Sequence, residues 1–308
     1  MKRPSRRTVA IVLALVVVAG FVVARTFRTT TTEISEADAI DRYESATEDD
    51  SDDASAADEM AGSAEPEEQA ADEIEEQDVA DNSAENQAVS GAEETDSSTT
   101  VTTSVPEEVT PVVLPLPQPG VYAVTVIGGE QLALAAGADR TYPAEGFVTV
   151  APVACGVDVR TDFVVERWQS IELCEAEAGL ELGTERIFHS FFGLDDLLER
   201  SCVASPLALD ATSWLCENES SVAERAVTAE TVMRDVAGAS REVVVFMTEL
   251  VRGDHPDNVE LIELWVDVET GVPVREARRY DFVLDTPLGD AGYTEDYVWE
   301  VSSLEPIA

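Results

Sequence analysis

The sequence predicts a mainly β protein: a curved antiparallel sheet or half-barrel with one or two short helices, preceded by a disordered linker and an N-terminal transmembrane helix. Three observations predict this fold class. An uncharged apolar run lies near the N-terminus, an acidic stretch with almost no aromatic residues follows it, and short runs rich in Val, Tyr, Phe, Trp and Thr begin after Gly120. We therefore divide the chain into a cytoplasmic tail and anchor at 1–28, a linker at 29–118 and an extracytoplasmic β-rich domain at 119–308.

The apolar run at residues 9–24 reaches the lower end of the length that crosses a bilayer. Four basic residues precede it, and two follow it before the acidic stretch begins. This asymmetry predicts a single-pass anchor in the cell membrane, with the N-terminus cytoplasmic and the C-terminal domain extracellular. A cleaved signal peptide is the alternative, because Val22 and Ala24 stand where small residues precede a cleavage site. In both interpretations the β-rich domain lies outside the cytoplasm.

The linker is dominated by negative charge, since residues 33–110 carry 27 acidic side chains against the single basic residue Arg42. Such a stretch buries too little apolar surface to offset the entropy lost on ordering, which predicts disorder. Charge repulsion extends it, so we expect a solvated spacer that lifts the domain away from the membrane. A tail that binds cations or a basic partner is the alternative. The net charge of −44 excludes nucleic acid as an expected partner, because binding to phosphates requires basic side chains.

Beyond Gly120, runs of β-branched and aromatic residues between Gly, Pro and Asp predict successive strands. We expect them at 121–127, 147–153, 158–165, 168–174, 214–217, 222–234, 241–252, 259–268, 272–284 and 294–304. Short connections between these runs predict antiparallel neighbours. In the last run, alternate positions from Tyr293 to Val301 are mainly aromatic, so that face should be buried. We expect a short helix at 194–199 that covers the concave side of the sheet.

All four cysteines lie in the predicted exported domain, and an even number of cysteines outside the cytoplasm is typical of disulfides. Of the three possible connectivities, the bonds Cys155–Cys174 and Cys202–Cys216 are favoured because each closes a short loop. Zinc is the alternative, but the chain has no C-x-x-C pair and thiolates oxidise outside the cell. We expect no metal and no cofactor.

The stretch WVDVETGVPVREA, residues 265–277, has the pattern of two strands joined by a tight turn at 269–271. It resembles the W-V/I-D-x-x-T-G-x-P-x-R hairpin of the periplasmic lipoprotein carriers, the LolA and LppX-like superfamily. That resemblance implies a curved antiparallel half-barrel closed by helices over an apolar cavity. The acidic linker and paired cysteines are not features of those soluble carriers. The order of anchor, linker and β domain is also similar to membrane-anchored envelope proteins of actinobacteria.

The function that these features favour is a membrane-anchored module that binds a lipid or another hydrophobic ligand. Phe188, Phe191, Phe192 and Trp265 are the candidate ligand-lining residues. The alternative is a structural or protein-interaction module of the cell envelope, in which these side chains fill a core without a cavity. We do not expect an enzyme or catalytic residues, because no motif combines a nucleophile, a base and oxyanion donors.

Overall fold

The computed structural model describes residues 31–56, 112–133, 138–191, 194–286 and 289–308. The candidate anchor at 9–24 and Phe192 lie outside these ranges. Within them, no helix is both long and apolar enough to cross a membrane. The elements are α2 (Glu36–Ala56), β1 (Gly120–Ala133), β2 (Ala138–Thr141), β3 (Glu145–Val153), β4 (Gly156–Val164), β5 (Arg167–Ala176), β6 (Gly179–Phe191), β7 (Leu194–Val203), β8 (Ser213–Glu217), β9 (Val222–Val236), β10 (Ala239–Arg252), β11 (Val259–Asp267), β12 (Pro273–Thr286) and β13 (Gly289–Val301).

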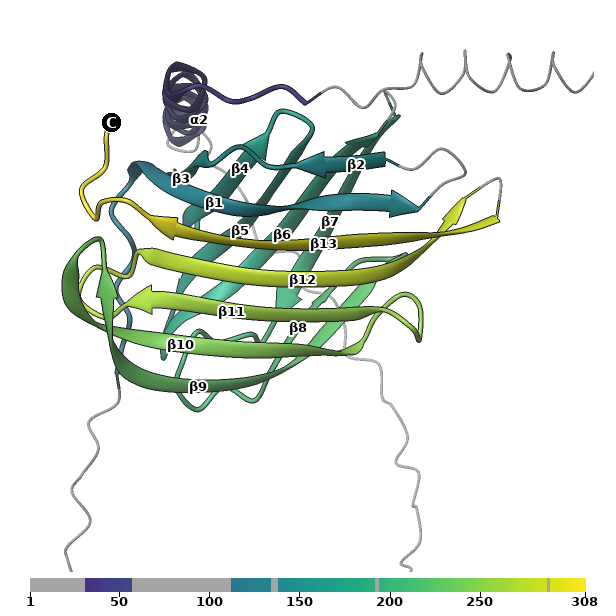
Figure 1. Ribbon diagram of the computed structural model, residues 1–308. Helices are drawn as coiled ribbons and strands as arrows, with labels where there is room; N and C mark the ends of the chain where they lie inside the picture. The colour runs from purple at the N-terminus through teal and green to yellow at the C-terminus, as the bar shows by residue number, and fades with distance from the viewer. Residues whose placement is uncertain (1–30, 57–111, 134–137, 192–193, 287–288) are drawn as a thin grey trace, which may run out of the picture. The chain divides into compact units, whose positions relative to one another are not determined.

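The strands form one antiparallel sheet that closes on itself (Figure 1). From β3 to β13 each strand pairs with the next in the chain, and β1 pairs with both β3 and β13. The result is a closed barrel of twelve strands, with β2 as an extra strand beside β1. The mainly β antiparallel prediction is confirmed. The half-barrel expectation is not met, because apolar alternation marks the two faces of a sheet but does not tell whether its edges meet.

The ten predicted strands all correspond to observed ones, but β2, β6 and β7 were not predicted. The helix predicted at 194–199 is wrong, because these residues belong to β7, which pairs with β6 through Ile187 and Leu198. The local sequence favours a helix, but pairing with β6 on one side and β8 on the other satisfies its backbone groups as a strand.

The helix α2 lies in the stretch predicted as a disordered linker, so that prediction is wrong for residues 36–56. Ser35 caps the helix: its hydroxyl accepts a hydrogen bond from Asp38 N, and the Asp38 carboxylate accepts one from Ser35 N. The acidic residues Glu36 and Asp38 in the first turn complement the helix dipole. The cap therefore starts a helix in a sequence whose composition indicates none.

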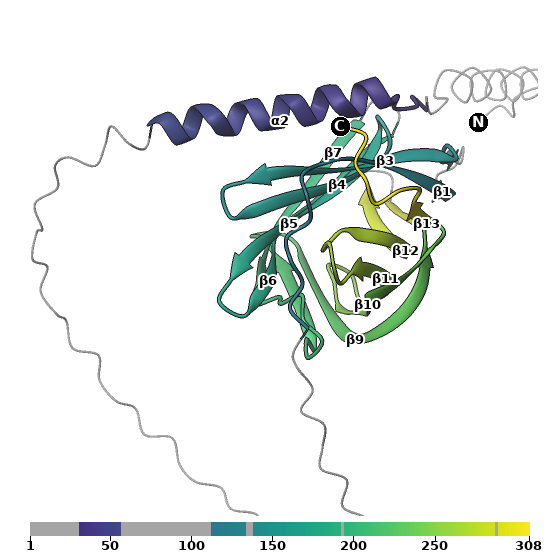
Figure 2. The same ribbon diagram turned by 90° about the vertical axis from the view of Figure 1, so that its left-hand side faces the viewer.

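The barrel has two unlike ends. One end, which we call the closed end, is crossed by residues 112–119 and by the C-terminal segment (Figure 2). Leu114 is buried in the main core there, and Ile307 N donates a hydrogen bond to Val121 O. Gly271 has a φ of 70°, and a side chain at this position would collide with the carbonyl oxygen of Pro115. We call the opposite end the pocket end. It contains Leu132 on β1, Phe191 on β6, Arg252 on β10 and Gly289 on β13.

Candidate functional site

The interior of the barrel is built in three layers. Four strands carry the same order of inward side chains from the pocket end to the closed end: Leu132, Glu130 and Val126 on β1, Ile187, Glu185 and Leu182 on β6, Tyr280, Arg278 and Val274 on β12, and Tyr293, Glu295 and Trp299 on β13. The first residue of each set belongs to a small apolar cluster, the second is charged and the third belongs to the main core. A charged layer therefore separates two apolar layers.

This charged belt consists of five arginines and five glutamates, so its formal charges cancel. Every member is less than 9% exposed: Arg140, Arg167, Arg200, Arg225, Arg278, Glu130, Glu185, Glu260, Glu276 and Glu295. Arg225 links two strands by donating to Glu185 at 2.8 Å and to Glu260 at 2.7 Å. Buried charges are tolerated only when they are paired and hydrogen-bonded, as they are here.

Tyrosines extend the belt and remain protonated. Burial, reinforced by the negative charges of Glu276 and Glu295, raises the pKa of Tyr297 well above its ordinary value. Tyr297 donates a 2.5 Å hydrogen bond to Glu276, and Tyr293 donates one of 2.8 Å to Glu130. These phenols therefore act as hydrogen-bond donors to the carboxylates rather than as bases.

A pocket of about 180 Å³, which we call the aromatic pocket, opens at the pocket end, on the outer side of the charged belt. Its lining comes from β6, β7, β12 and β13 and consists of Ile187, His189, Phe191, Asp196, Leu198, Tyr280, Phe282 and Tyr293. Phe191 packs edge-on against Tyr293 with ring centroids 6.1 Å apart, and Tyr280 packs in the same manner against Phe282 at 4.9 Å. Asp196 is exposed, so this wall of the aromatic pocket reaches solvent.

Two polar atoms in the pocket wall have no partner among the described residues. Nδ1 of His189 lies 3.4 Å from Glu130 Oε2 and 3.4 Å from Tyr293 OH, and Nε2 makes no hydrogen bond to the described residues. The hydroxyl of Tyr280 is buried and has no hydrogen-bond partner. A buried hydroxyl in this state costs about 1–3 kcal/mol.

The carboxylate of Glu130, in the charged belt, contacts the imidazole ring of His189. Burial acts to raise the pKa of Glu130, but its hydrogen bond and electrostatic interaction with His189 and the positive charges of Arg140 and Arg167 outweigh burial and hold the pKa below its ordinary value. The ionised carboxylate fixes the orientation of the imidazole ring, as carboxylates do for histidines in many binding sites.

A second cavity, of about 80 Å³, lies between the charged belt and the main core. Trp214, Leu264 and Val266 form an apolar wall, while Gln169 and Glu276 present polar groups. Its size suits a few water molecules rather than an organic ligand.

The structure separates the candidate ligand-lining residues. Phe191 lines the aromatic pocket, but Phe188 faces the outside of the barrel, where its ring stacks on Trp168 at 5.5 Å. Trp265 also faces outward, between the guanidinium groups of Arg234 and Arg275 at 5.3 and 4.6 Å from its ring. The sequence analysis missed Tyr280, Phe282 and Tyr293 as pocket residues. The period-two alternation toward Tyr293 was visible, but the depth of each residue along the barrel was not.

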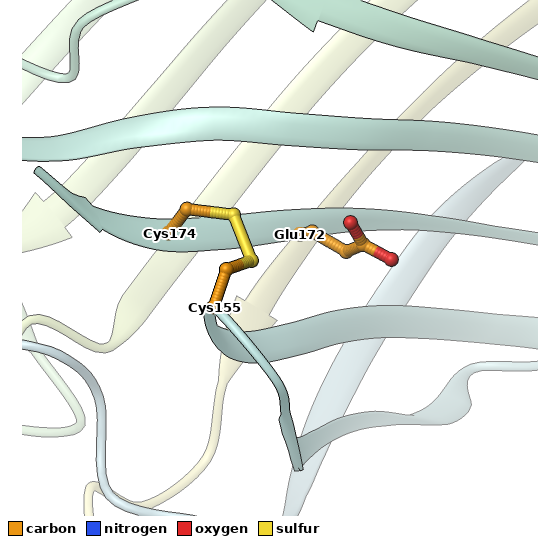
Figure 3. A group of neighbouring side chains, drawn as sticks. All are labelled: Cys155, Glu172 and Cys174. Carbon is orange, nitrogen blue, oxygen red and sulfur yellow. A yellow bond between two sulfur atoms is a disulfide. The ribbon is translucent and has the colours of Figure 1, made fainter. Parts of the chain in front are cut away.

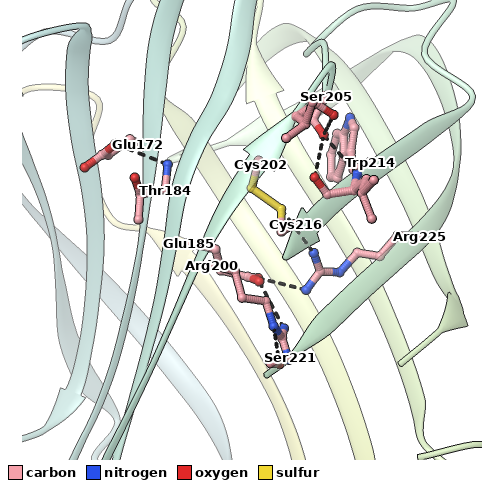
Figure 4. The surroundings of a disulfide bond; sticks show 12 residues. Glu172, Thr184, Glu185, Arg200, Cys202, Ser205, Trp214, Cys216, Ser221 and Arg225 are labelled. Atoms are coloured by element: carbon pink, nitrogen blue, oxygen red, sulfur yellow. Dashed lines mark hydrogen bonds and ion pairs between the residues drawn. A yellow bond between two sulfur atoms is a disulfide. The ribbon is translucent and has the colours of Figure 1, made fainter. Parts of the chain in front are cut away.

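The two predicted disulfides are confirmed. Cys155 is bonded to Cys174 and Cys202 to Cys216, and the described residues contain no free cysteine. Glu172 lies beside the first bond, an arrangement that resembles a metal site (Figure 3), but both sulfur atoms are already bonded to one another and are not thiolates. The second bond lies next to the charged belt, with Arg225 Nη1 3.9 Å from Cys216 Sγ (Figure 4).

Comparison of the chain with protein-family models, with curated proteins and with solved structures gives no match. The functional argument therefore rests on the geometry of the barrel.

Proposed function

We propose that the barrel is a binding module for one small, mainly apolar molecule that carries a single polar group. The observation that carries this proposal is the aromatic pocket with two unpartnered polar atoms, Tyr280 OH and His189 Nε2, in its wall. Apolar and aromatic walls with a few convergent polar groups are typical of small-molecule sites.

The pocket volume limits the ligand. An apolar cavity of about 150 Å³ accepts a benzene ring, whereas sites for drug-sized molecules enclose about 300–1,000 Å³. At about 180 Å³, the pocket suits one aromatic ring or a short branched chain. The expectation of a hydrophobic ligand is thereby narrowed, and a lipid with long acyl chains is disfavoured.

The proposed setting is the outer side of a cell membrane, with the module attached by an N-terminal anchor. The apolar run at 9–24 and its basic flank support this location. The two disulfides support an oxidising compartment. The similarity of the Trp265 hairpin to the lipoprotein carriers supports a hydrophobic ligand but does not identify one.

The second candidate function is a structural or protein-interaction module of the cell envelope. The observation that favours it is the balanced charged belt, whose buried and paired side chains cross the middle of the barrel. We favour binding over catalysis, because the described residues of the pocket wall include no serine, threonine or cysteine nucleophile.

Extraction of the purified protein with organic solvent, followed by mass spectrometry, tests the binding proposal. We expect one compound with a single ring or short chain at about one molecule per chain. The variant Phe191→Trp fills the pocket and should no longer carry the compound. Phe188→Trp, on the outer face of the same strand, should still carry it. A compound retained equally by both variants would contradict the proposal, as would a wild-type protein that neither carries nor takes up such a molecule.

A further inference from the structure

The stretch that precedes α2 is attached to the pocket end of the barrel. Thr32 donates two hydrogen bonds to the carboxylate of Glu166, from N at 2.9 Å and from Oγ1 at 2.7 Å, and its carbonyl accepts one from Val165 N at 3.0 Å. Glu166 lies in the turn between β4 and β5. Its carbonyl accepts a 2.8 Å hydrogen bond from Ser190 N, whose chain neighbours His189 and Phe191 line the aromatic pocket.

The helix α2 is also fixed to the barrel wall. Arg42 donates a 2.8 Å hydrogen bond to Asp162, whose side chain is fully buried. Ile34 and Ala39 pack with Phe147 in a separate small core. Arg42 is the only basic residue between positions 33 and 110, and it meets a buried carboxylate. We call the contacts of Thr32 and Arg42 together the clasp.

The clasp limits the distance between the pocket and a membrane anchor. Thr32 follows Ala24, the end of the apolar run, by eight residues. A fully extended chain spans about 3.3–3.6 Å per residue, so this connection reaches at most about 30 Å. The acidic residues 57–111 lie between two segments that both contact the barrel, α2 and Val112, and therefore add nothing to that distance.

The pocket end also carries exposed aliphatic side chains. Val165, Leu197, Val251 and Val259 are 41–60% exposed, and each lies in or near a hairpin of this end. Isolated apolar side chains are common on protein surfaces. Val113, Val203 and Met233 at the closed end are similarly exposed, so the clasp rather than these side chains distinguishes the two ends.

We propose that the clasp holds the barrel close to the bilayer with its aromatic pocket toward the membrane, so that the ligand is a membrane-soluble small molecule that enters from the lipid surface. This rests on the proposed function for the ligand and on the predicted anchor for the attachment. The expectation of a spacer that lifts the domain is replaced by a domain held within about 30 Å of the membrane.

Fluorescence quenching on the full-length protein in lipid vesicles tests the orientation. Val251→Cys at the pocket end and Met233→Cys at the closed end are matched sites, 60% and 57% exposed, for attachment of a thiol-reactive fluorophore, while the native cysteines are protected as disulfides. With nitroxide-labelled lipid headgroups, we expect several-fold stronger quenching at position 251. Arg42→Glu combined with Thr32→Pro opens the clasp and should remove the difference.

Equal quenching at both sites of the wild-type protein, or stronger quenching at position 233, would overturn the proposal. Failure of the protein to float with the vesicles would also overturn the proposal, because it would show that the chain has no membrane anchor. Phenol, a single aromatic ring with one polar group, represents the proposed ligand. Its binding is measured in the same vesicles as a separate readout. Retained phenol binding with equal quenching would refute the orientation alone, and lost phenol binding with unequal quenching would refute the ligand alone.

Discussion

Arg167 donates two hydrogen bonds of 2.9 Å to the carboxylate of Glu295, one to each oxygen, and both side chains are completely buried. The two residues are 128 positions apart in the chain and come from β5 and β13. Burial acts to lower the pKa of Arg167, but the charge of Glu295 and its hydrogen bond outweigh burial and raise it well above the ordinary value. The pair therefore joins opposite walls of the barrel as an ionised pair.

We predict that Glu295→Gln destabilises the protein by about 3–5 kcal/mol, because it leaves the Arg167 guanidinium buried without a counter-charge. Urea denaturation followed by far-UV circular dichroism measures the change. Arg252→Ala, which removes an exposed ion pair with Glu224, is the control and should cost less than about 1 kcal/mol. Equal losses for the two variants would show that the belt pair does not stabilise the barrel.

The second prediction concerns the disulfide beside the belt. Replacement of both Cys202 and Cys216 by alanine opens a loop with a sequence separation of 14 and should cost about 3 kcal/mol. The urea midpoint of the variant, compared with that of the wild type before and after reduction, measures the loss. A midpoint that does not change would mean that the bond adds no stability to the barrel.

The third prediction is acid sensitivity through Glu130. Its folded-state pKa lies below the ordinary value of 4.5, so it contributes stability that is fully present above pH 4.5 and is lost as the pH falls through the folded pKa. We expect the free energy of unfolding of the wild type to fall steadily below pH 4.5. Glu130→Gln should be less stable near neutral pH, with a flatter pH dependence in the acid range. Parallel curves for the two proteins would contradict this assignment.

The fourth prediction uses two phenylalanines of one strand. Phe191→Ala enlarges the aromatic pocket and should weaken phenol binding, with a stability loss below the 3–5 kcal/mol typical of a fully buried phenylalanine, because Phe191 is only half-buried. Phe188→Ala removes the outer stack on Trp168 and should leave phenol binding unchanged. Calorimetric titration measures both affinities. Weaker binding in Phe188→Ala and not in Phe191→Ala would place the ligand outside the barrel.

The sequence predicts strands better than it predicts the interior. The alternation from Tyr293 to Val301 correctly indicates a buried face, because side-chain direction follows from local geometry. The charged belt is invisible at that level, since Glu295 within this alternation is buried only because Arg167 meets it from a distant strand. A charged residue taken alone is expected on the surface.

The same limit explains the missed helix. The acidic composition of residues 36–56 predicts disorder, and the contacts that fix the helix come from Asp162 and Phe147, more than 100 positions away. The aromatic pocket was predicted only through Phe191. Tyr280 and Phe282 join it because β12 lies next to β13 in the closed barrel, which follows from strand pairing and not from residue type.

Calorimetric titration of the protein with phenol and with toluene, two rings of similar size, tests the central claim most directly. We predict saturable binding of both, with phenol about two- to tenfold tighter, because one hydrogen bond to Tyr280 OH or His189 Nε2 contributes about 0.5–1.5 kcal/mol. The double variant Tyr280→Phe with His189→Leu should bind toluene and lose the preference for phenol. Absence of saturable binding for either compound would contradict the claim that the barrel is a small-molecule binding module.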